Sequence, residues 1–424
     1  MLSLRTVVSL GLVCAGLLQA AEGADWLRFR GPNGLGASDA RNLPSTWSDT
    51  QGIVWKTELA GPGASSPIVV GDRIFVTSFR GVSTDKPGDL AGLEYVLTCL
   101  DRRSGKLQWQ QVEKAKPGED RYEGFLAGHG YASNTPTSDG QRVFTFYGKS
   151  GVHAYTLSGE KLWSQDVGNG SAPVNWGTAN SPILYKDKLI VPATSESKSL
   201  IAFNVQTGKE EWKLTADGFY GTWSTPGLVT LPSGKQELVI AVPYEIWGID
   251  PESGTFLWYS EGVKEDVVCT SPVIRGDMVY VVGGRNGSAV AVQAGGKDEV
   301  TKTHMKWSKS IGSYVTSPVI HGDHLYWVSD RGIAICLALA DGATVYQSRI
   351  PDGGQMYASV LVADDKLYAV TRQNGTFVVA AKPEFELLQH VEFAPKEEVF
   401  NGSPAVTEGR LLFRSDRFLY CVGK

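Results

Sequence analysis

The stretch "TSPVIRGDMVYVVGGRNGSAVAV", residues 270–292, alternates short β-rich runs with turns made of Gly, Asp and Asn. That alternation is typical of an antiparallel meander. Its opening, a small polar residue that Pro usually follows, recurs eight times in the chain. The copies start at Ser66-Pro67, Thr135-Pro136, Ser181-Pro182, Thr225-Pro226, Ser271-Pro272, Ser317-Pro318, Ser359-Val360 and Ser403-Pro404. They are separated by 69, 46, 44, 46, 46, 42 and 44 residues, and a period of about 40–50 residues predicts a propeller or another repeat architecture.

A second segment recurs in most units, as in "AFNVQTGKEEW" at residues 202–212. It places a polar turn that ends in Gly before a fourth strand that carries a large aromatic residue. The fifth unit has an inserted stretch before this aromatic, and the sixth carries Tyr346 in place of Trp. Because such side chains bury about 150–250 Å² each, we expect them to fill the gap between adjoining sheets. The expected blade-docking residues are Trp55, Trp109, Trp163, Trp212, Trp258 and Trp307.

Eight units of four strands predict an all-β fold, an eight-bladed β-propeller of four-stranded antiparallel blades. After Ser403 the chain has room for only three more strands, whereas "GIVWKTEL" at residues 52–59 precedes the first unit. Pairing of this N-terminal strand with the C-terminal strand would complete the last blade and leave no open edge. The expected organisation is a signal peptide at 1–23, an N-terminal arm at 24–51 and the propeller at 52–424.

Composition and the start of the chain limit where the protein works. The 424 residues carry a formal net charge of -5 without a block of five like charges, so nucleic acid is not an expected partner. One positive charge at Arg5, an apolar run over 7–18 and small residues over 20–24 are typical of a secretory signal. No later run reaches the roughly 18 apolar residues of a membrane helix. We expect a periplasmic or secreted monomer without a membrane span.

The docking segment resembles the tryptophan-docking motif of pyrroloquinoline quinone (PQQ) dehydrogenases, Ala-x-Asp-x-x-Thr-Gly-x-x-x-Trp. Residues 202–212 match it with Asn204 for Asp, and residues 99–109 match it with Cys99 for Ala and Ser104 for Thr. The repeats also resemble those of the BamB propeller family, whose members use them as a non-catalytic scaffold. The segment "DWLRFRGPNGLGAS" from Asp25 is similar to the leader of many secreted bacterial PQQ-repeat propellers. These resemblances imply the propeller fold.

A quinoprotein dehydrogenase of this kind would be expected to have a vicinal Cys-Cys pair, a calcium site of Glu, Asn and Asp, and a catalytic Asp. No Cys-Cys or Cys-x-x-Cys-His occurs in this sequence, so a covalent haem is excluded. Cys99, Cys336 and Cys421 occupy the slot that Ala202 fills in its own unit, which indicates core thiols. The close pair His321 and His324 lies in a turn that needs no metal to explain it. We therefore expect no catalytic residue, metal site or cofactor, with PQQ and calcium as the alternative.

One constellation of residues points to binding. In a meander, the loops before strand one and between strands two and three lie on the same face, around the mouth of the central channel. The second set of loops offers the cations Lys149, Arg285, Arg331, Arg372, Arg414 and Arg417. The first set offers aromatic residues and amides, chiefly Tyr131, Trp176, Trp223, Tyr314 and Tyr357. A ring of this kind could bind an anionic or polysaccharide ligand, or a peptide. The competing interpretation is that the cations are solvated and the aromatic residues pack between blades.

Two further features lie on this expected face. The carboxylates of Glu265, Asp266, Glu397 and Glu398 could hold calcium or pair with the arginines. Long insertions at 80–95 and 114–133 also fall there, and loops on a rigid scaffold are where binding usually resides. Our hypothesis is a secreted, non-catalytic scaffold that binds a protein or polysaccharide of the cell envelope at this loop-rich face. The alternative is a PQQ- and calcium-dependent alcohol or sugar dehydrogenase.

Overall fold

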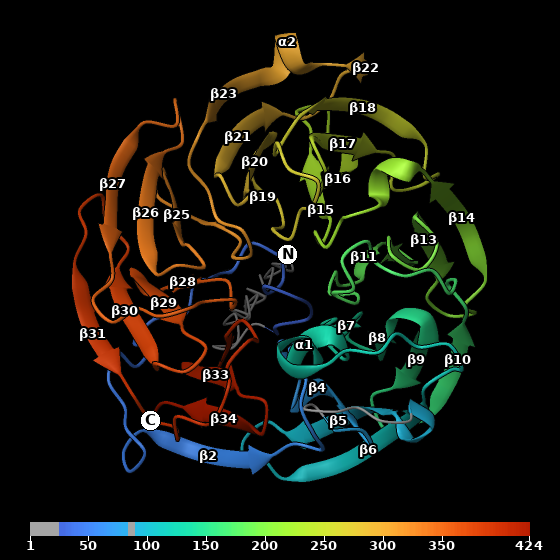
Figure 1. Cartoon of the computed structure of the whole chain (residues 1–424), viewed down its shortest axis with the longest axis vertical. Helices are drawn as coiled ribbons and strands as arrows, with labels where there is room; N and C mark the ends of the chain where they lie inside the picture. Colours follow the sequence, from blue (N-terminus) through green and yellow to red (C-terminus); the bar gives the residue numbers. More distant parts are fainter. Residues whose placement is uncertain (1–24, 84–89) are drawn as a thin grey trace, which may run out of the picture.

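The computed structural model describes residues 25–83 and 90–424, whose strands form eight sheets around a central axis (Figure 1). Each sheet is a blade of four antiparallel strands, and two blades gain a short fifth strand in parallel. The expected eight-bladed propeller is confirmed. The expected signal peptide lies outside the described residues, as does 84–89 within the first insertion.

In blades 1–4 the first strand along the chain is innermost and the fourth is outermost. Blade 1 contains β3 (Ile68–Val70), β4 (Arg73–Arg80), β5 (Glu94–Asp101) and β6 (Leu107–Lys114), with η1 (Leu90–Gly92) before β5. Blade 2 contains β7 (Thr137–Ser138), β8 (Arg142–Phe146), β9 (Val152–Thr156) and β10 (Lys161–Gln165), with η3 (Gly148–Ser150) before β9. Blade 3 contains β11 (Ile183–Tyr185), β12 (Lys188–Ala193), β13 (Ser199–Asn204) and β14 (Glu210–Thr215). Blade 4 contains β15 (Gly227–Thr230), β16 (Gln236–Val242), β17 (Glu245–Ile249) and β18 (Phe256–Glu261), preceded by η4 (Asp217–Phe219).

Blades 5–7 follow the same order, and blade 8 combines both ends of the described chain. Blade 5 contains β19 (Val273–Arg275), β20 (Met278–Gly283), β21 (Ser288–Gln293) and β23 (Met305–Lys309). Blade 6 contains β24 (Val319–His321), β25 (His324–Val328), β26 (Ile333–Ala338) and β27 (Thr344–Arg349). Blade 7 contains β28 (Leu361–Ala363), β29 (Lys366–Val370), β30 (Thr376–Ala380) and β31 (Leu387–Val391). Blade 8 contains β32 (Ala405–Thr407), β33 (Arg410–Arg414), β34 (Phe418–Val422) and, outermost, β2 (Ile53–Glu58).

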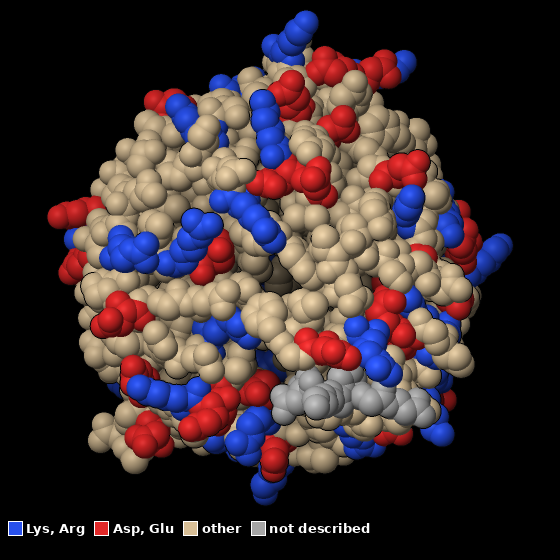
Figure 2. All heavy atoms as spheres, in the orientation of Figure 1, with Lys and Arg blue, Asp and Glu red and all other residues tan. Residues whose placement is uncertain are grey.

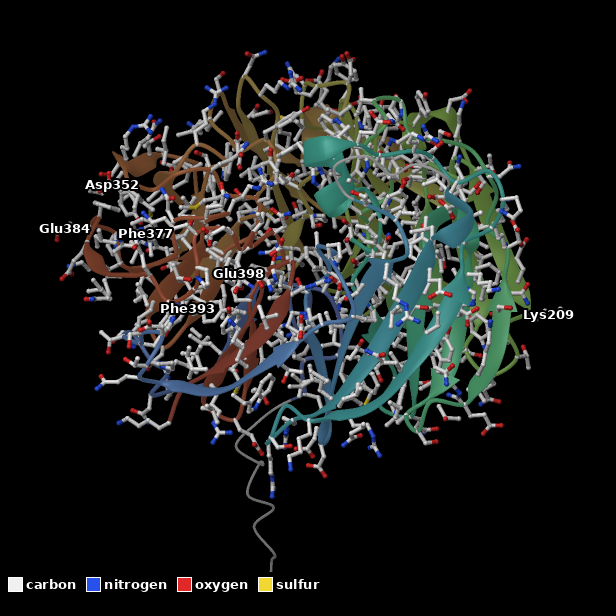
Figure 3. The ribbon with its side chains drawn as sticks, turned by 60° about the horizontal axis from the view of Figure 1, so that its bottom comes forward. Lys209, Asp352, Phe377, Glu384, Phe393 and Glu398 are labelled. Carbon is white, nitrogen blue, oxygen red and sulfur yellow. The ribbon has the colours of Figure 1, made fainter. Side chains whose placement is uncertain are left out.

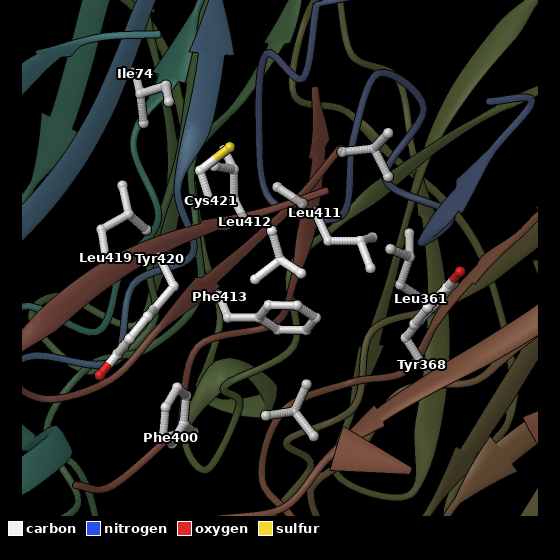
Figure 4. Close-up of a cluster of buried hydrophobic side chains, with 14 of the residues drawn as sticks. Ile74, Leu361, Tyr368, Phe400, Leu411, Leu412, Phe413, Leu419, Tyr420 and Cys421 are labelled. Carbon is white, nitrogen blue, oxygen red and sulfur yellow. The ribbon is translucent and has the colours of Figure 1, made fainter. Parts of the chain in front are cut away.

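The ring is closed by strand pairing between the two ends of the propeller. β2 pairs antiparallel with β34, and Trp55 lies opposite Cys421. A buried cluster that includes Leu412, Phe413 and Tyr420 of blade 8 also joins blades 7 and 1, through Tyr368 and Ile74 (Figure 4). The expected closure by N- and C-terminal strands is therefore confirmed, and β34 is not left as an open edge.

The recurring Ser and Thr residues form a belt of hydrogen bonds around the channel, which we call the belt. The backbone N–H of each of the first seven donates to the hydroxyl oxygen of the corresponding residue in the next blade, at 2.9–3.0 Å. Among the described residues these bonds run in sequence through Ser66, Thr135, Ser181, Thr225, Ser271, Ser317, Ser359 and Ser403. The Pro that usually follows has no N–H, so the belt residue supplies the donor at this point of the chain.

Five tryptophans connect a blade to the turn before the outer strand of the next one. Each indole Nε1–H donates to a backbone carbonyl of that turn, at 2.8–3.3 Å. The turn needs Gly because the ring lies against it: a Cβ atom on Gly208, whose φ is 69°, would lie 2.6 Å from the Trp163 ring. The five donors and their acceptors are Trp55 to Arg102, Trp109 to Leu157, Trp163 to Val205, Trp212 to Pro251 and Trp307 to Leu339.

Trp258 packs between blades 4 and 5, in a buried cluster with Val279 and Val292, but its indole hydrogen bond differs from those of the five tryptophans above. It is fully buried, and its Nε1–H donates to Glu237 of its own blade at 2.7 Å. The reason lies in the insertion of the fifth unit, where β22 (Asp298–Glu299) and α2 (Thr301–His304) stand in place of the Gly turn. β22 instead pairs in parallel with β18, the strand that carries Trp258.

The N-terminal arm crosses the far end of the channel (Figure 1). Trp26 exchanges two 2.9 Å backbone hydrogen bonds with Val69 of blade 1, and the carbonyl of Leu27 accepts from Ser138 of blade 2. The guanidinium of Arg30 donates to the carbonyl of Pro318 in blade 6. Beyond it, β1 (Ala37–Ser38) pairs with β28 of blade 7. The arm therefore spans the ring from blades 1 and 2 to blade 7.

Candidate functional site

A cavity of about 350 Å³ lies at the mouth of the channel on the loop-rich face, and we call it the cup. Figure 2 shows a hollow near the centre of this face, with basic side chains toward blades 5–7 and uncharged surface toward blade 3. Phe29 of the N-terminal arm belongs to the lining, so the arm closes the cup from the far side. The lining consists of Phe29, Ala64, Ser66, Phe125, Leu126, His129, Ser133, Trp176, Ala179, Trp223, Thr225, Cys269, Ser271, Arg285, Tyr314, Val315, Ser317, Tyr357, Ser359, Asn401 and Ser403.

Aromatic side chains from separate blades form much of the cup wall. Trp176 packs against Trp223 with ring centroids 5.2 Å apart, and edge-on against Tyr314 at 5.7 Å. The Nε1–H of Trp223 donates to the carbonyl of Gly177 at 2.7 Å, which fixes the ring. With Tyr357, these are four of the five aromatic residues that the sequence placed at the mouth, and the structure brings them together around one cavity.

Two of the expected arginines lie on these aromatic rings. The guanidinium of Arg285 is 4.7 Å from the centroid of Tyr314. Arg372 lies 4.5 Å from Phe125 and 5.0 Å from Tyr357, and it donates to the side-chain oxygens of Asn401 (3.0 Å) and Gln355 (3.1 Å). Within the described residues neither arginine forms an ion pair, because the hydrogen-bond acceptors around them are neutral.

The second insertion supplies residues that sequence reasoning missed individually. Its short helices η2 (Gly124–Leu126) and α1 (Ala127–Gly130) reach across the mouth to blade 7, where the ring of Phe125 lies 5.8 Å from that of Tyr357. The His129 ring lies 4.9 Å from Phe125. Burial, reinforced by the charge of Arg372, lowers the pKa of His129 to about 4, so this histidine is neutral at neutral pH. The sequence signalled only that the insertion was long.

Three of the expected ring residues serve the fold instead. Arg414 is buried as the last residue of β33, and its Nη1 donates to the backbone O and Oγ of Ser65 at 2.9 and 2.7 Å, joining blade 8 to blade 1. Tyr131 is buried, and its hydroxyl donates to the carbonyl of Asp120. Lys149 forms an ion pair with the Asp120 carboxylate at 2.8 Å. Their side chains point into the protein because the loops are anchored through them.

The two remaining cations and the expected carboxylates also lie outside the cup lining. Arg331 is exposed, and the exposed Arg417 lies over the Phe418 ring at 5.2 Å. Glu398 is buried inside blade 8, whereas Glu384 projects from the outside of the molecule (Figure 3). The carboxylate of Glu398 accepts hydrogen bonds from the Tyr420 hydroxyl at 2.7 and 2.8 Å.

Other carboxylates lie in a small chamber of about 20 Å³ at the base of the second insertion. Glu196 is 5% exposed, and its Oε2 has no hydrogen-bond partner. Burial, together with the charge of Glu119, raises the pKa of Glu196 to about 8. Glu119 accepts a 2.6 Å hydrogen bond from Ser150, but burial raises its pKa as well. The insertion therefore lies beside two carboxyl groups whose charged forms are disfavoured by burial.

The lining of the cup lacks the groups that calcium and a quinone require. Calcium takes six to eight oxygen ligands, carboxylates prominent among them, yet no Asp or Glu is part of the lining given above. In residues 25–83 and 90–424, no three or more His, Cys, Asp or Glu side chains are grouped so as to hold a metal. Cys269 is the lining's single cysteine, so the described residues offer no cysteine pair to stack on a quinone. The lining of the cup therefore does not fit calcium and a quinone.

Comparison with known proteins assigns the chain to a family. The family described as "Outer membrane protein assembly factor BamB" matches residues 37–119 and 92–348, which is more than half of the sequence. The chain belongs to this family. No curated protein matches this BamB-family chain.

Solved structures share the fold at low sequence identity. BamB from Moraxella catarrhalis is 12% identical, with a TM-score of 0.61 over 87% of this chain and 96% of that one. A quinohemoprotein alcohol dehydrogenase from Comamonas testosteroni is 12% identical, with a TM-score of 0.60 over 94% of this chain and 80% of that one. The computationally designed protein Ika8 is 10% identical, with a TM-score of 0.58 over 87% of this chain and 98% of that one. Because the three differ in nature, the likeness shows the fold alone.

The match to an outer-membrane assembly family suggests the cell envelope as the place of action. None of the helices in the described part of the chain has the length and apolar character needed to cross a membrane.

Proposed function

We propose that this BamB-family chain is a non-catalytic scaffold of the cell envelope that captures a segment of another protein in the cup and on the surrounding loops. The observation that carries the proposal is the character of the cup. Its walls are aromatic, Arg285 lines it, Arg372 lies over two of the lining rings, and no carboxylate is part of the lining. Aromatic and arginine side chains are the residues that dominate the energetics of protein interfaces.

The chemistry of the lining favours binding over catalysis. General acid–base catalysis works best with a group whose pKa lies near the working pH, and the pKa of His129 is lowered to about 4 by burial. Burial also raises the pKa of Cys269 to about 12. The thiol is therefore protonated at neutral pH, whereas the nucleophile in cysteine chemistry is the thiolate.

Site-specific photo-crosslinking in the native envelope tests the proposal. With a photoreactive phenylalanine in place of Tyr357, we expect crosslinks to a defined protein. The crosslinks should fade in the Arg285→Ala/Arg372→Ala double variant, because the cup loses the cation in its lining and the one that lies over Phe125 and Tyr357. Arg331→Ala is the matched control, since Arg331 is exposed on the same face but does not line the cup. Equal crosslinking from His321, on the opposite face, or unchanged crosslinking in the double variant would contradict capture by the cup.

The alternative activity, a PQQ- and calcium-dependent alcohol or sugar dehydrogenase, has its own test. The purified protein is mixed with PQQ and calcium, and quinone absorbance and dye reduction are followed with alcohols and sugars. The scaffold proposal expects neither saturable binding nor turnover. Dye reduction that requires PQQ, calcium and substrate together would replace the scaffold by the enzyme. A polysaccharide ligand is tested by whether cell-envelope glycans compete with the Tyr357 crosslink.

A further inference from the structure

The cup is closed at its far end, which restricts what can enter it. The N-terminal arm is hydrogen-bonded to blade 1 through Trp26 and to blade 7 through Gly36, whose carbonyl accepts from Val362 at 2.8 Å. Phe29, between these anchor points, forms part of the cup lining. A polypeptide cannot thread through a channel that is closed in this way. What enters from the loop-rich face must be a side chain or a chain end.

The cup offers hydrogen-bond donors and positive charge. Arg285 of blade 5 lines the cup, and Arg372 of blade 7 lies over the lining rings of Phe125 and Tyr357. Within the described residues neither arginine forms an ion pair, although the charge of Glu265 acts on Arg285. Belt hydroxyls line the floor, and those of Ser271, Ser317 and Ser359 already accept an amide N–H. Each of these hydroxyls therefore still has its O–H donor and a second lone pair. A ligand that matches this lining is rich in acceptors and negatively charged.

The same cavity has walls that suit an apolar body. Trp176, Trp223 and Phe125 contribute ring faces and edges to it. The apolar character continues outside, because loops of blades 2–4 carry large exposed apolar side chains. These are Val174, Tyr220 and Tyr244, which are 42–51% exposed. An extended segment that leaves the cup toward these blades would meet apolar surface.

We propose that the cup receives the carboxyl end of a polypeptide whose last residue is apolar. This inference rests on the proposed scaffold function and names what the scaffold recognises. The terminal carboxylate meets the guanidinium group of Arg285 and the floor hydroxyls, and the last side chain packs against the tryptophans. A free N-terminus is disfavoured because its ammonium group would face Arg285, while the lining contains no carboxylate to pair with it. A small carboxylic acid shares the charge chemistry but lacks the chain that reaches the apolar surface of blades 2–4.

Peptide binding to the full chain tests this inference. The probe is a dye-labelled peptide of about ten Gly, Ser and Thr residues that ends in Phe, with either a free carboxylate or a terminal amide. Fluorescence anisotropy should show that the carboxylate form binds ~10- to 100-fold more tightly, since this is the effect of a charged hydrogen-bonded pair. Moving the Phe to the middle of the same peptide should weaken binding about tenfold or more, because the end that enters the cup is then polar.

Variants test whether the cup causes the preference for a terminal carboxylate over a terminal amide. Arg285→Gln, at an exposed side chain that the fold does not need, should reduce the ratio between carboxylate and amide about tenfold, and Arg331→Gln should leave it unchanged. Equal affinity for both forms, or a ratio that survives Arg285→Gln, overturns recognition of the chain end. No binding of any peptide also overturns it, while the crosslinking result decides the scaffold function separately. Competition by phenylpropionate at the affinity of the peptide would assign the cup to a small acid and overturn the polypeptide.

Discussion

The buried carboxyl group of Glu196 lowers the stability of the fold when it ionises. It lies between β12 and β13 with one carboxylate oxygen unpartnered, and the charged groups that face it include Glu119 and Lys149. Its pKa is raised from 4.5 to about 8, chiefly by burial. A raised pKa means that its contribution to stability is fully present below pH 4.5 and is lost as the pH rises through 8. Glu196 therefore costs the fold stability at alkaline pH.

Glu196→Gln should remove this cost, because a neutral amide replaces a group that resists ionisation. At pH 5 the free energy of unfolding should stay close to that of the parent protein, and at pH 8.5 it should rise by up to about 4 kcal/mol. Urea unfolding at the two pH values measures both. Glu252→Gln is the control: its exposed carboxylate pairs with Lys186 and Lys188, and these partners lower the pKa of Glu252 to about 2. A gain for Glu196→Gln at pH 5 as large as at pH 8.5 would contradict the account.

At the scale of the element, the outer strands carry two classes of contact that look alike in sequence. Trp212 on β14 and Trp258 on β18 have the same position in their units. Trp212 docks onto Pro251 of the next blade, whereas Trp258 turns to Glu237 in its own. The difference arises in blade 5. There the segment with β22 and α2 replaces the Gly turn that accepts the indole hydrogen bond in other blades. An insertion in one blade thus changes the role of a residue in the blade before it.

Trp212→Ala should destabilise the fold by about 3–5 kcal/mol, because it empties the space between blades 3 and 4. Trp212→Phe should cost less, since the ring remains and the indole hydrogen bond to Pro251, worth about 1 kcal/mol, is lost. Trp176→Ala in the cup wall is the matched control and should change stability little, because Trp176 is partly exposed. Denaturant unfolding followed by circular dichroism measures all three. A loss for Trp176→Ala equal to that for Trp212→Ala would remove the distinction between docking and cup tryptophans.

The whole molecule depends on closure of the ring by β2. This strand covers the edge of β34, and its Lys56 lies 3.4 Å from the buried carboxylate of Glu398. Removing residues 52–59 would leave β34 unpaired and Glu398 without its cation. Loss of the partner of a buried charge costs about 3–5 kcal/mol on its own.

Deletion of residues 52–59 should therefore lower the melting temperature by at least about 5 °C and promote self-association through the open edge. Calorimetry and size-exclusion chromatography measure the two effects. Removal of Lys424 alone, an exposed residue at the end of the chain, is the control and should leave both unchanged. A melting curve that the deletion does not shift would show that closure adds nothing to stability.

The repeat, the four-stranded unit, the number of blades and the closing strand could all be predicted from the sequence. These follow from local patterns: Ser-Pro starts, Gly turns and alternating apolar runs report on neighbours along the chain or one unit away. The family match and the strand pairing of β2 with β34 agree with them. At the mouth the same patterns placed Trp176, Trp223, Tyr314 and Tyr357 correctly on one face, because a regular meander fixes which loops share a side.

Which of those residues meet depends on packing between blades, and local patterns do not predict it. The tertiary structure buried Arg414 at the seam between blades 8 and 1 and tied Lys149 to Asp120, because side-chain direction at a strand end depends on the packing of the neighbouring blade. It also brought Phe125 and His129 from the second insertion to Tyr357 on blade 7, and Phe29 from the N-terminal arm to the cup. These contacts join segments far apart in the chain, and a periodic pattern carries no record of a contact that occurs once.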